Sequence, residues 1–230
     1  DVAEAYDKFE FHVVYQKLSQ FAAVELSAMY HDLVKDRLYT DPAGSHRRRS
    51  TQTALHRLVT SLCQMLSPIL VFTTDEAWEF VPGTTARSPH MSVWQPKQFT
   101  PDAEETKDWA LQFAVREQVL ATLEGLRRDK VIGKSLDARV EITGLGNSAA
   151  SAGREEALRE LTNVSQFKLR DSALLSGDSG TGVNLDRIEV AGMAAAGQKC
   201  ARCWHWETDV GSDAQHPTIC GRCVEAVSAA

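Results

Sequence analysis

Apolar side chains recur every three or four positions over the first forty residues, which predicts a long amphipathic helix. The positions on this stripe are Phe11, Val14, Leu18, Ala22, Leu26, Met29 and Leu33. The Asp-Pro-Ala-Gly sequence at 41–44 interrupts the pattern, and a second stripe follows at Leu55, Leu58, Leu62, Met65, Leu66 and Ile69. We expect Pro68 to kink or end this second helix, because proline has no amide hydrogen to donate.

Two more helices are predicted before residue 128. Thr73, with Glu76 three positions later, forms a capping-box pattern for a short helix that the Pro-Gly pair at 82–83 should end. The acidic sequence at 101–105 suits the positive end of a helix dipole and begins a helix to about Arg128. Its apolar positions are Trp109, Phe113, Leu120 and Leu123. Residues 1–128 are therefore predicted to form a helical bundle.

The period changes after residue 128. Leu136, Ala138, Val140 and Ile142 alternate with polar residues, as in a half-buried strand. A helix over 154–161 and strands over 164–169 and 183–190 are also expected, with the Ser/Gly-rich stretch 176–182 as a linker. This stretch lacks the Gly-Lys-Ser/Thr of a phosphate-binding loop. We predict a mainly α chain: a helical domain (1–128), a small α+β junction domain (129–196) and a zinc-ribbon-like module (197–230).

Composition narrows the class of protein. The chain has 230 residues, 25 Lys and Arg against 31 Asp and Glu, and a net charge of −6, which argues against indiscriminate binding of polyanions. It has no apolar run of about 18 residues, so we expect no membrane-spanning helix and no membrane partner. The amino end has neither Met nor a signal-peptide layout, which leads us to expect a piece of a longer protein. The cysteines are not spread over the chain as in a secreted disulfide scaffold, so we expect a cytoplasmic location.

Four of the five cysteines form two closely spaced pairs near the carboxyl end. Cys200 and Cys203 are separated by two residues, as are Cys220 and Cys223, and sixteen residues lie between the pairs. This spacing predicts one tetrahedral structural Zn²⁺ with no open position for catalysis. Redox disulfides or an iron–sulfur cluster are the alternatives, and His205 or His216 is a less favoured ligand. We expect metal binding and folding of this module to be one event.

Aromatic residues adjoin the first cysteine pair. Trp204, His205 and Trp206 either form the small core of the module or offer a face to an unstacked nucleic-acid base. Nearby cations are offset by acids and by the four thiolates, so phosphate binding cannot be the main role of this segment. These cations are Lys199, Arg202 and Arg222.

A basic cluster stands out in the acidic chain. Residues 35–57 contain six basic side chains and two acidic ones, Asp36 and Asp41. The basic residues are Lys35, Arg37, Arg47, Arg48, Arg49 and Arg57. We expect the Arg run on the connection between two helices, where it either binds phosphates or pairs with acids of the bundle. A second candidate patch comprises Arg127, Arg128, Lys130 and Lys134.

Several motifs together resemble the carboxy-terminal region of bacterial isoleucyl-tRNA synthetases, a class I family. They are Lys35-Asp36-Arg37-Leu38-Tyr39-Thr40, Arg48-Arg49-Ser50-Thr51-Gln52-Thr53-Ala54-Leu55, Ser67-Pro68-Ile69-Leu70, Lys130-Val131-Ile132-Gly133-Lys134-Ser135-Leu136, Cys200-Ala201-Arg202-Cys203-Trp204-His205 and Ile219-Cys220-Gly221-Arg222-Cys223. The helical motifs also fit the valyl, leucyl and methionyl enzymes, and the cysteine motifs select the isoleucyl enzyme. Ala201, where proline is expected, and Trp206, where another aromatic residue is usual, are departures from the family pattern.

The resemblance implies an anticodon-binding domain, a junction domain and a zinc module that approach the anticodon arm of tRNA(Ile). The parent would be a monomeric ligase that joins isoleucine to tRNA with ATP. The family's ATP-handling signatures, His-x-Gly-His and Lys-Met-Ser-Lys-Ser, do not occur here. We therefore expect this chain to be non-catalytic, with the rest of the synthetase and tRNA(Ile) as its partners and ATP bound only by the remainder of the parent.

The predicted tRNA contacts combine the basic and aromatic residues above. They are Lys35, Arg37, Arg47, Arg48, Arg49, Arg128, Lys130, Lys134, Arg202, Trp204, His205, Trp206 and Arg222. Two alternatives remain: a zinc module that only packs on the synthetase, and a DNA glycosylase of the formamidopyrimidine type. The glycosylase needs proline and glutamate at its amino terminus, whereas this chain begins Asp1-Val2.

Overall fold

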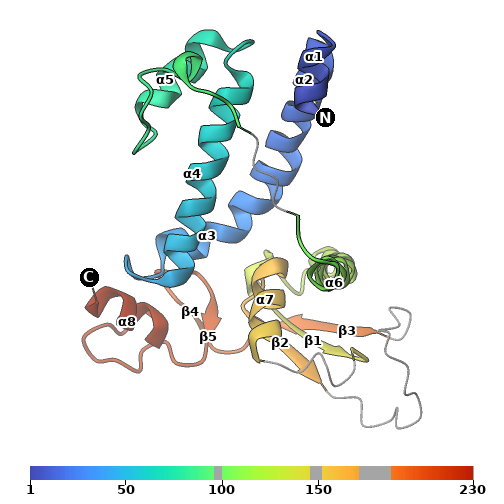
Figure 1. The fold of residues 1–230 in the computed structure, drawn as a ribbon. Helices are drawn as coiled ribbons and strands as arrows, with labels where there is room; N and C mark the ends of the chain where they lie inside the picture. Colours follow the sequence, from blue (N-terminus) through green and yellow to red (C-terminus); the bar gives the residue numbers. More distant parts are fainter. Residues whose placement is uncertain (96–99, 146–151, 171–187, 230) are drawn as a thin grey trace. The chain divides into compact units, whose positions relative to one another are not determined.

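The computed structural model describes residues 1–95, 100–145, 152–170 and 188–229. It divides into two compact units, residues 1–100 and 101–229 (Figure 1). Helices dominate, and the strands are few and short, which confirms the mainly α prediction. Among the described helices, none combines the length and the apolar character that crossing a bilayer requires.

The first unit is helical throughout. Its elements are α1 (Val2–Asp7), α2 (Phe11–Gln20), the π-helix η1 (Phe21–His31), α3 (Asp32–Tyr39), α4 (His46–Leu66), α5 (Val71–Glu79) and the 3₁₀ turn η2 (Pro89–Met91). The backbone stays helical from α2 through η1 into α3, which confirms the long first helix. Only Val14, Leu18 and Val34 are buried along it, and η1 has no buried residue. Full burial is therefore confined to the two ends of this helix, whereas Leu26 and Met29 of the predicted stripe are partly buried within η1.

Helix α4 ends where the sequence predicts, and α5 begins differently. The Ser45 hydroxyl caps α4 by accepting a hydrogen bond from the Arg48 amide, and α4 stops at Leu66, before Pro68. The capping-box prediction was wrong, because α5 begins at Val71 and has no side-chain cap. Thr73 is thus inside the helix. The next residue, Thr74, donates its hydroxyl to the Leu70 carbonyl at 2.9 Å, which is the backward bond that a helical threonine favours.

The second unit places helices against a small sheet. Its elements are α6 (Ala103–Arg128), the 3₁₀ turn η3 (Ser135–Asp137), β1 (Ala138–Thr143), α7 (Ala152–Thr162), β2 (Gln166–Arg170), β3 (Glu189–Ala194), β4 (Gln198–Lys199), β5 (Trp206–Glu207) and α8 (Gly221–Ser228). The sheet order is β2-β1-β3, with β1 parallel to β2 and antiparallel to β3. A crossover is required between parallel strands, and α7 supplies it.

The strands follow the predicted periodicity with small shifts. Ala138, Val140 and Ile142 are buried in alternation on β1, as expected, but Leu136 belongs to η3 and not to the strand. The helix over 154–161 and the strand over 164–169 correspond to α7 and β2. The Ser/Gly-rich stretch 176–182 and the beginning of the strand predicted at 183–190 lie outside the described residues. The end of that strand is β3.

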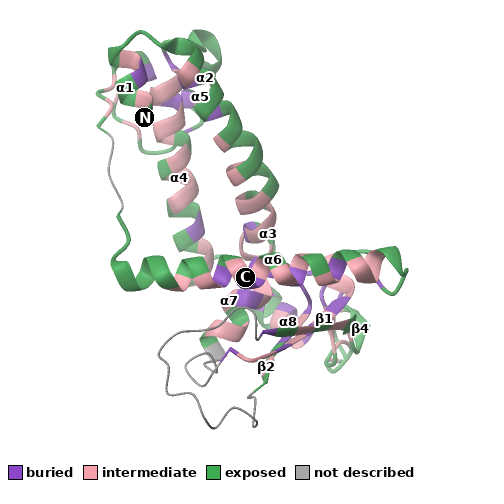
Figure 2. Ribbon diagram, turned by 90° about the vertical axis from the view of Figure 1, so that its right-hand side faces the viewer, coloured by how far each residue is buried: buried purple, intermediate pink, exposed green. Residues whose placement is uncertain are grey.

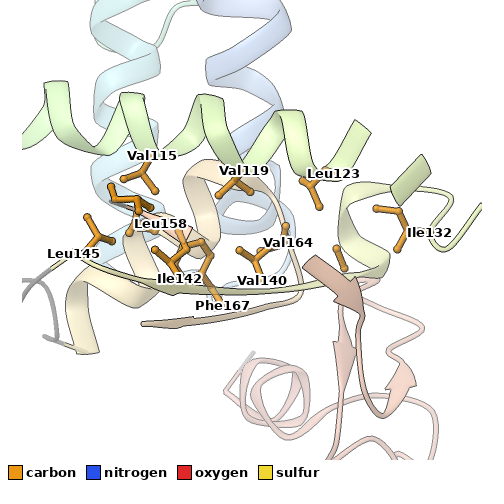
Figure 3. Close-up of a cluster of buried hydrophobic side chains, with 12 residues drawn as sticks. Val115, Val119, Leu123, Ile132, Val140, Ile142, Leu145, Leu158, Val164 and Phe167 are labelled. Carbon is orange, nitrogen blue, oxygen red and sulfur yellow. The ribbon is translucent and has the colours of Figure 1, made fainter. Parts of the chain in front are cut away.

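Helix α6 packs on the sheet through aliphatic residues. Val115, Val119 and Leu123 of α6 lie over Val140 and Ile142 of β1, and all five are buried completely (Figure 3). Exposed residues gather in the first turns of α6 (Figure 2). This packing differs from the expected stripe, because its two aromatic members remain 45% and 38% exposed. They are Trp109 and Phe113.

The close approach of α6 to β3 depends on a glycine. A Cβ atom at Gly192 would lie 2.8 Å from Cδ1 of Leu126, closer than side chains tolerate. By its packing α6 belongs to the second unit, whereas the sequence analysis grouped it with the preceding helices. The predicted domain limits at 128 and 196 refer to the domains of the family and not to compact packing units. They stay predictions.

Candidate metal centre and nucleic-acid interface

The four paired cysteines converge on one point. The Sγ atoms of Cys200, Cys203, Cys220 and Cys223 all lie within 4.8 Å of one another, and the four residues are buried. The Sγ atoms of Cys203 and Cys220 are 3.8 Å apart. Zinc–sulfur bonds of about 2.3 Å in a tetrahedron require sulfur atoms about 3.8 Å apart, so the four thiols fit a zinc ion. The prediction of a metal site with four cysteine ligands is confirmed in geometry.

Local backbone structure places each pair of ligands. The first pair lies in the turn between β4 and β5, where the Cys200 amide donates to the His205 carbonyl at 2.8 Å. The second pair lies at the start of α8, with Cys220 as its N-cap residue. The Cys220 amide also donates to the Cys200 sulfur at 3.4 Å, which joins the two pairs. Amide donors and the helix N-terminus both favour thiolate over thiol.

The thiols depend on one another for their protonation. A hydrogen bond from the Cys223 thiol lowers the pKa of Cys203 to about 4, and the same bond raises the pKa of Cys223. Burial raises the pKa of Cys220 to about 11. Without a cation, the cluster therefore stabilises one thiolate while other thiols keep their protons. A divalent ion that binds all four sulfurs as thiolates must displace those protons.

Arg202 takes part in this cluster. Its Nη1 atom lies 3.6 Å from the Cys223 sulfur, to which it donates. A cation here offsets part of the negative charge that four thiolates leave on a divalent ion. The sequence analysis assigned Arg202 to tRNA, and the structure places it against the metal ligands. Arg222, also predicted to contact tRNA, is half-buried in the first turn of α8.

The three aromatic residues after Cys203 have different environments. Trp204 is 61% exposed and has a φ of +66°. His205 is only 7% exposed, and its Nδ1 atom accepts a hydrogen bond from Arg159 at 3.0 Å. Trp206 is half-buried and donates its indole N–H to Asp137 at 3.0 Å. The core interpretation therefore holds for Trp206 and His205, which pack on the protein, whereas Trp204 is largely exposed.

Neither histidine of the tail joins the metal ligands. Among the described residues, the cluster that could hold an ion consists of the four cysteines. The His205 ring is turned toward Arg159, and His216 lies in the loop before α8, where its amide donates to Asp213.

The Arg run lies on a helix and not, as expected, on the connection between helices. Arg47, in the first turn of α4, donates to both carboxylate oxygens of Asp41 at 2.9 Å, and its Nη2 lies 3.2 Å from Asp36. Arg48 donates to the Asp41 carbonyl at 3.0 Å. The alternative of pairing with acids of the bundle therefore holds for Arg47. Lys35 of the same basic cluster likewise pairs with an acid, Asp32.

Arg49 differs from Arg47 and Arg48 in its surroundings. It is exposed, and within the described part of the chain no carboxylate pairs with its guanidinium group. It lines a surface cavity of about 540 Å³ on α4 and the preceding loop. The lining residues carry cations and hydroxyl groups but no acid: Gly44, His46, Arg49, Ser50, Thr53, Ala54 and Arg57.

The other predicted basic contacts lie on α3 and after α6. Lys35 of α3 pairs with Asp32 at 2.8 Å, and Arg37 occupies the last turn of the same helix. Arg128, Lys130 and Lys134 are exposed in the second unit. Arg127 instead bonds Glu124 and Ser135, so it is engaged within the protein.

Comparison with known proteins supplies the family. A family model described as the anticodon-binding domain of tRNA ligase matches residues 1–142. The chain belongs to this anticodon-binding family of tRNA ligases. A second model, described as the zinc finger found in FPG and IleRS, matches residues 197–226.

Bacterial relatives agree with both matches. The isoleucine–tRNA ligase of Pectobacterium carotovorum is 39% identical over 236 residues, which cover 99% of this chain and 24% of the relative. That of Halorhodospira halophila is 38% identical over 232 residues, with 99% and 25% covered. The chain spans about a quarter of the length of the curated relatives it matches. The resemblance to the carboxy-terminal region of bacterial isoleucyl-tRNA synthetases is confirmed.

The sequence analysis missed the residues that hold the zinc module on the sheet. Arg159 reaches His205 across 46 positions of the chain, and Asp137 reaches Trp206 across 69. No motif marks either residue. In the sequence, Asp137 occupies one of the polar positions of the alternating strand pattern, and such positions are ordinarily exposed to solvent.

Proposed function

We propose that this chain binds the anticodon arm of tRNA(Ile) as part of an isoleucine–tRNA ligase, whose reaction with isoleucine and ATP takes place elsewhere in the longer protein. The observation that carries the proposal is the acid-free cavity lined by His46, Arg49 and Arg57 on α4. It lies within the residues that match the anticodon-binding domain of tRNA ligases. Cationic and hydroxyl side chains around one cavity are suited to RNA phosphates.

The arrangement of the Arg run supports separate roles for its members. Arg47 is fixed by two carboxylates and holds the first turn of α4. Arg49, one residue after the half-buried Arg48, is directed to solvent at the positive end of the same helix. The N-terminus of a helix carries the positive end of the helix dipole, which disfavours a cation placed there. An anion bound at this end is stabilised by the helix dipole and by the cationic side chain. Arg49 is therefore the primary phosphate contact.

The zinc module contributes an aromatic surface to this function. The Trp204 ring is 61% exposed beside a metal ligand, and stacking of an unpaired base on an aromatic ring is worth about 1–3 kcal/mol. Anticodon-loop bases are accessible for such stacking, because RNA loops unstack more readily than helices. When bound, the zinc ion supplies rigidity to the turn that carries Trp204. His205, Trp206 and Arg202 are engaged within the protein and serve the interface indirectly.

The test measures how tRNA(Ile) binding by this chain depends on salt. Each phosphate contact contributes about 0.7–0.9 to the slope of log affinity against log salt concentration. We expect Arg49→Ala to lower that slope by about this amount, for cognate and non-cognate tRNA alike. Arg87→Ala, which removes another exposed arginine of the first unit, is the matched control and should leave the slope unchanged. Equal slopes for both variants would remove Arg49 from the interface.

A scaffold role for the zinc module, without RNA contact, is the second candidate. It is favoured by the hydrogen bonds that attach Trp206 and His205 to the second unit itself. Trp204→Ala separates the two, because an exposed ring that only covers its own module has no effect on RNA affinity. Weaker binding of tRNA(Ile) by this variant supports recognition, and unchanged binding supports the scaffold.

A further inference from the structure

The zinc module is attached to the α+β part of the second unit by several hydrogen bonds, most of them partly buried. The Trp206 indole N–H donates to Asp137 Oδ1 at 3.0 Å, and its backbone amide donates to the Ser165 hydroxyl at 2.7 Å. Ser165 is 2% exposed, and its hydroxyl in turn donates to the Leu136 carbonyl. Trp206 is therefore held at both its ring and its backbone.

Arg159 of α7 makes a second attachment one residue away. Its Nη1 atom donates to His205 Nδ1 at 3.0 Å and to the Ser165 carbonyl at 3.2 Å, and it lies 3.6 Å from the Glu207 carboxylate. The Arg159 side chain is only 17% exposed. Since a guanidinium group has only donors, Nδ1 of His205 is the acceptor and the proton of the neutral ring is on Nε2. This arrangement orients the imidazole as well as the chain beside it.

A side-chain amide closes the same junction. Gln166 donates its Nε2 to the Ala196 carbonyl at 2.9 Å and accepts the Ala196 amide at 3.1 Å, and its Nε2 lies 3.3 Å from the Trp206 carbonyl. Ala196, in the connection between β3 and β4, is thus paired at both its backbone N–H and its carbonyl. Two parts of the zinc module are thus hydrogen-bonded to Gln166 of β2: the segment before β4, through Ala196, and the strand β5, through Trp206.

The attached strand follows a metal ligand directly. Trp204, His205 and Trp206 come immediately after Cys203, and the His205 carbonyl accepts the Cys200 amide inside the metal-binding turn. The direction of the Trp204 ring is consequently set on one side by the cysteine cluster and on the other by Trp206 and His205. A loose module would have to lose its orientational freedom each time a base stacked on the ring, which would weaken binding.

We propose that Trp206 and Arg159 are positioning residues that lock the zinc module onto the α+β part of its unit and so fix the direction in which Trp204 meets an RNA base. The lock itself follows from the contacts above, and its effect on RNA rests on the proposed function. Neither residue touches RNA in this arrangement. Both act through Trp204.

The experiment compares wild type with Trp206→Phe, Trp204→Ala and the double variant. Phenylalanine keeps an aromatic ring and removes the indole donor. Trp109→Phe, at a 45% exposed tryptophan of α6 that has no part in the lock, is the matched control. Three quantities are measured on each protein: zinc per chain, amide hydrogen exchange over residues 195–207, and affinity for tRNA(Ile).

For Trp206→Phe we expect unchanged zinc content, since all four thiols remain, and faster exchange over 195–207. Affinity should fall, and the fall in the double variant should equal that of Trp204→Ala alone, roughly 5- to 150-fold for one lost stack. This non-additivity distinguishes positioning from general destabilisation, which would weaken the double variant further.

Two results would overturn the proposal: unchanged exchange in Trp206→Phe, or losses of affinity that add in the double variant. If Trp204→Ala binds tRNA normally while Trp206→Phe still exchanges faster, the lock stands and recognition of RNA by the tail fails. Should Trp206→Phe lose zinc, Ser165→Ala instead removes the acceptor of the Trp206 backbone amide, leaves every residue of the zinc module native and is judged by the same results.

Discussion

Replacing Arg47 by alanine should destabilise the first unit far more than replacing its neighbour Arg49. Arg47 binds both oxygens of Asp41 and lies 3.2 Å from Asp36. The exposed fractions of these three side chains are 28%, 9% and 17%, respectively. The alanine variant would leave two largely buried carboxylates without this cation.

The structure gives the size of the effect. Breaking a buried ion pair by removing one partner costs about 3–5 kcal/mol, and water reaches the quarter-exposed Arg47 site, so we expect about 2–3 kcal/mol. That corresponds to roughly a 30- to 150-fold larger opening constant. Arg49→Ala, at an exposed residue without a carboxylate partner, should change stability by less than about 0.5 kcal/mol.

Amide hydrogen exchange of α4 residues 52–66 measures this quantity for the first unit alone, independently of the zinc module. Arg47→Lys should fall between wild type and alanine, because an ammonium group cannot match both carboxylate oxygens at once. Equal protection of α4 in Arg47→Ala and Arg49→Ala would refute the reasoning. The ion pairs of Arg47 would then contribute no more to stability than the exposed side chain of Arg49.

Three further predictions concern the second unit. Chelation of zinc, or Cys203→Ser, should shift Trp204 fluorescence and unfold α8 while β1–β3 keep their exchange protection; an unchanged emission spectrum after verified metal loss contradicts this. Burial opposes the shift, but hydrogen bonds from Trp206 and from two backbone amides lower the pKa of Asp137 below its ordinary 3.8. The stabilisation that ionised Asp137 provides is therefore complete above about pH 5 and is lost as the pH falls through its lower native pKa. Amide exchange of Trp206, followed in an acid titration, should show this loss in wild type and not in Asp137→Asn. Gly197→Ala would set a Cβ 2.3 Å from a β5 carbonyl oxygen at a φ of +94°, so zinc affinity measured by competition should fall; wild-type affinity would show that β4–β5 pairing is dispensable.

Periodicity predicted the kinds of elements well and their buried faces less well. The alternation through Val140 and Ile142 located β1, because a strand with one buried face must alternate. On α6, however, the large rings of Trp109 and Phe113 suggested a buried face that the structure gives to Val115 and Val119. Which side of α6 is buried depends on where the sheet lies, and that partner surface is not encoded within the helix.

The metal ligands could be read directly from the sequence, whereas their supports could not. The spacing of the cysteine pairs favours four sulfurs around one ion, and the folded chain brings them within 4.8 Å of one another. Arg159 and Asp137 act over 46 and 69 positions, so only the folded chain brings them to the zinc module. The Arg run shows the same limit: three consecutive arginines look equivalent until the fold directs Arg47 to acids and Arg49 to solvent.

The π-helical stretch η1, between α2 and α3, has a consequence for the cations beyond it. Hydrogen bonds in a π-helix span five residues, so each of its turns holds more residues than an α-turn. Gaining or losing one residue in 21–31 would rotate α3 around the axis it shares with α2, by somewhat less than the roughly 100° that one residue adds in an α-helix. Lys35 and Arg37 would then lie on a different side of the helix relative to α1 and α2. The number of residues in this stretch thus determines the direction, around the helix axis, in which the α3 cations project.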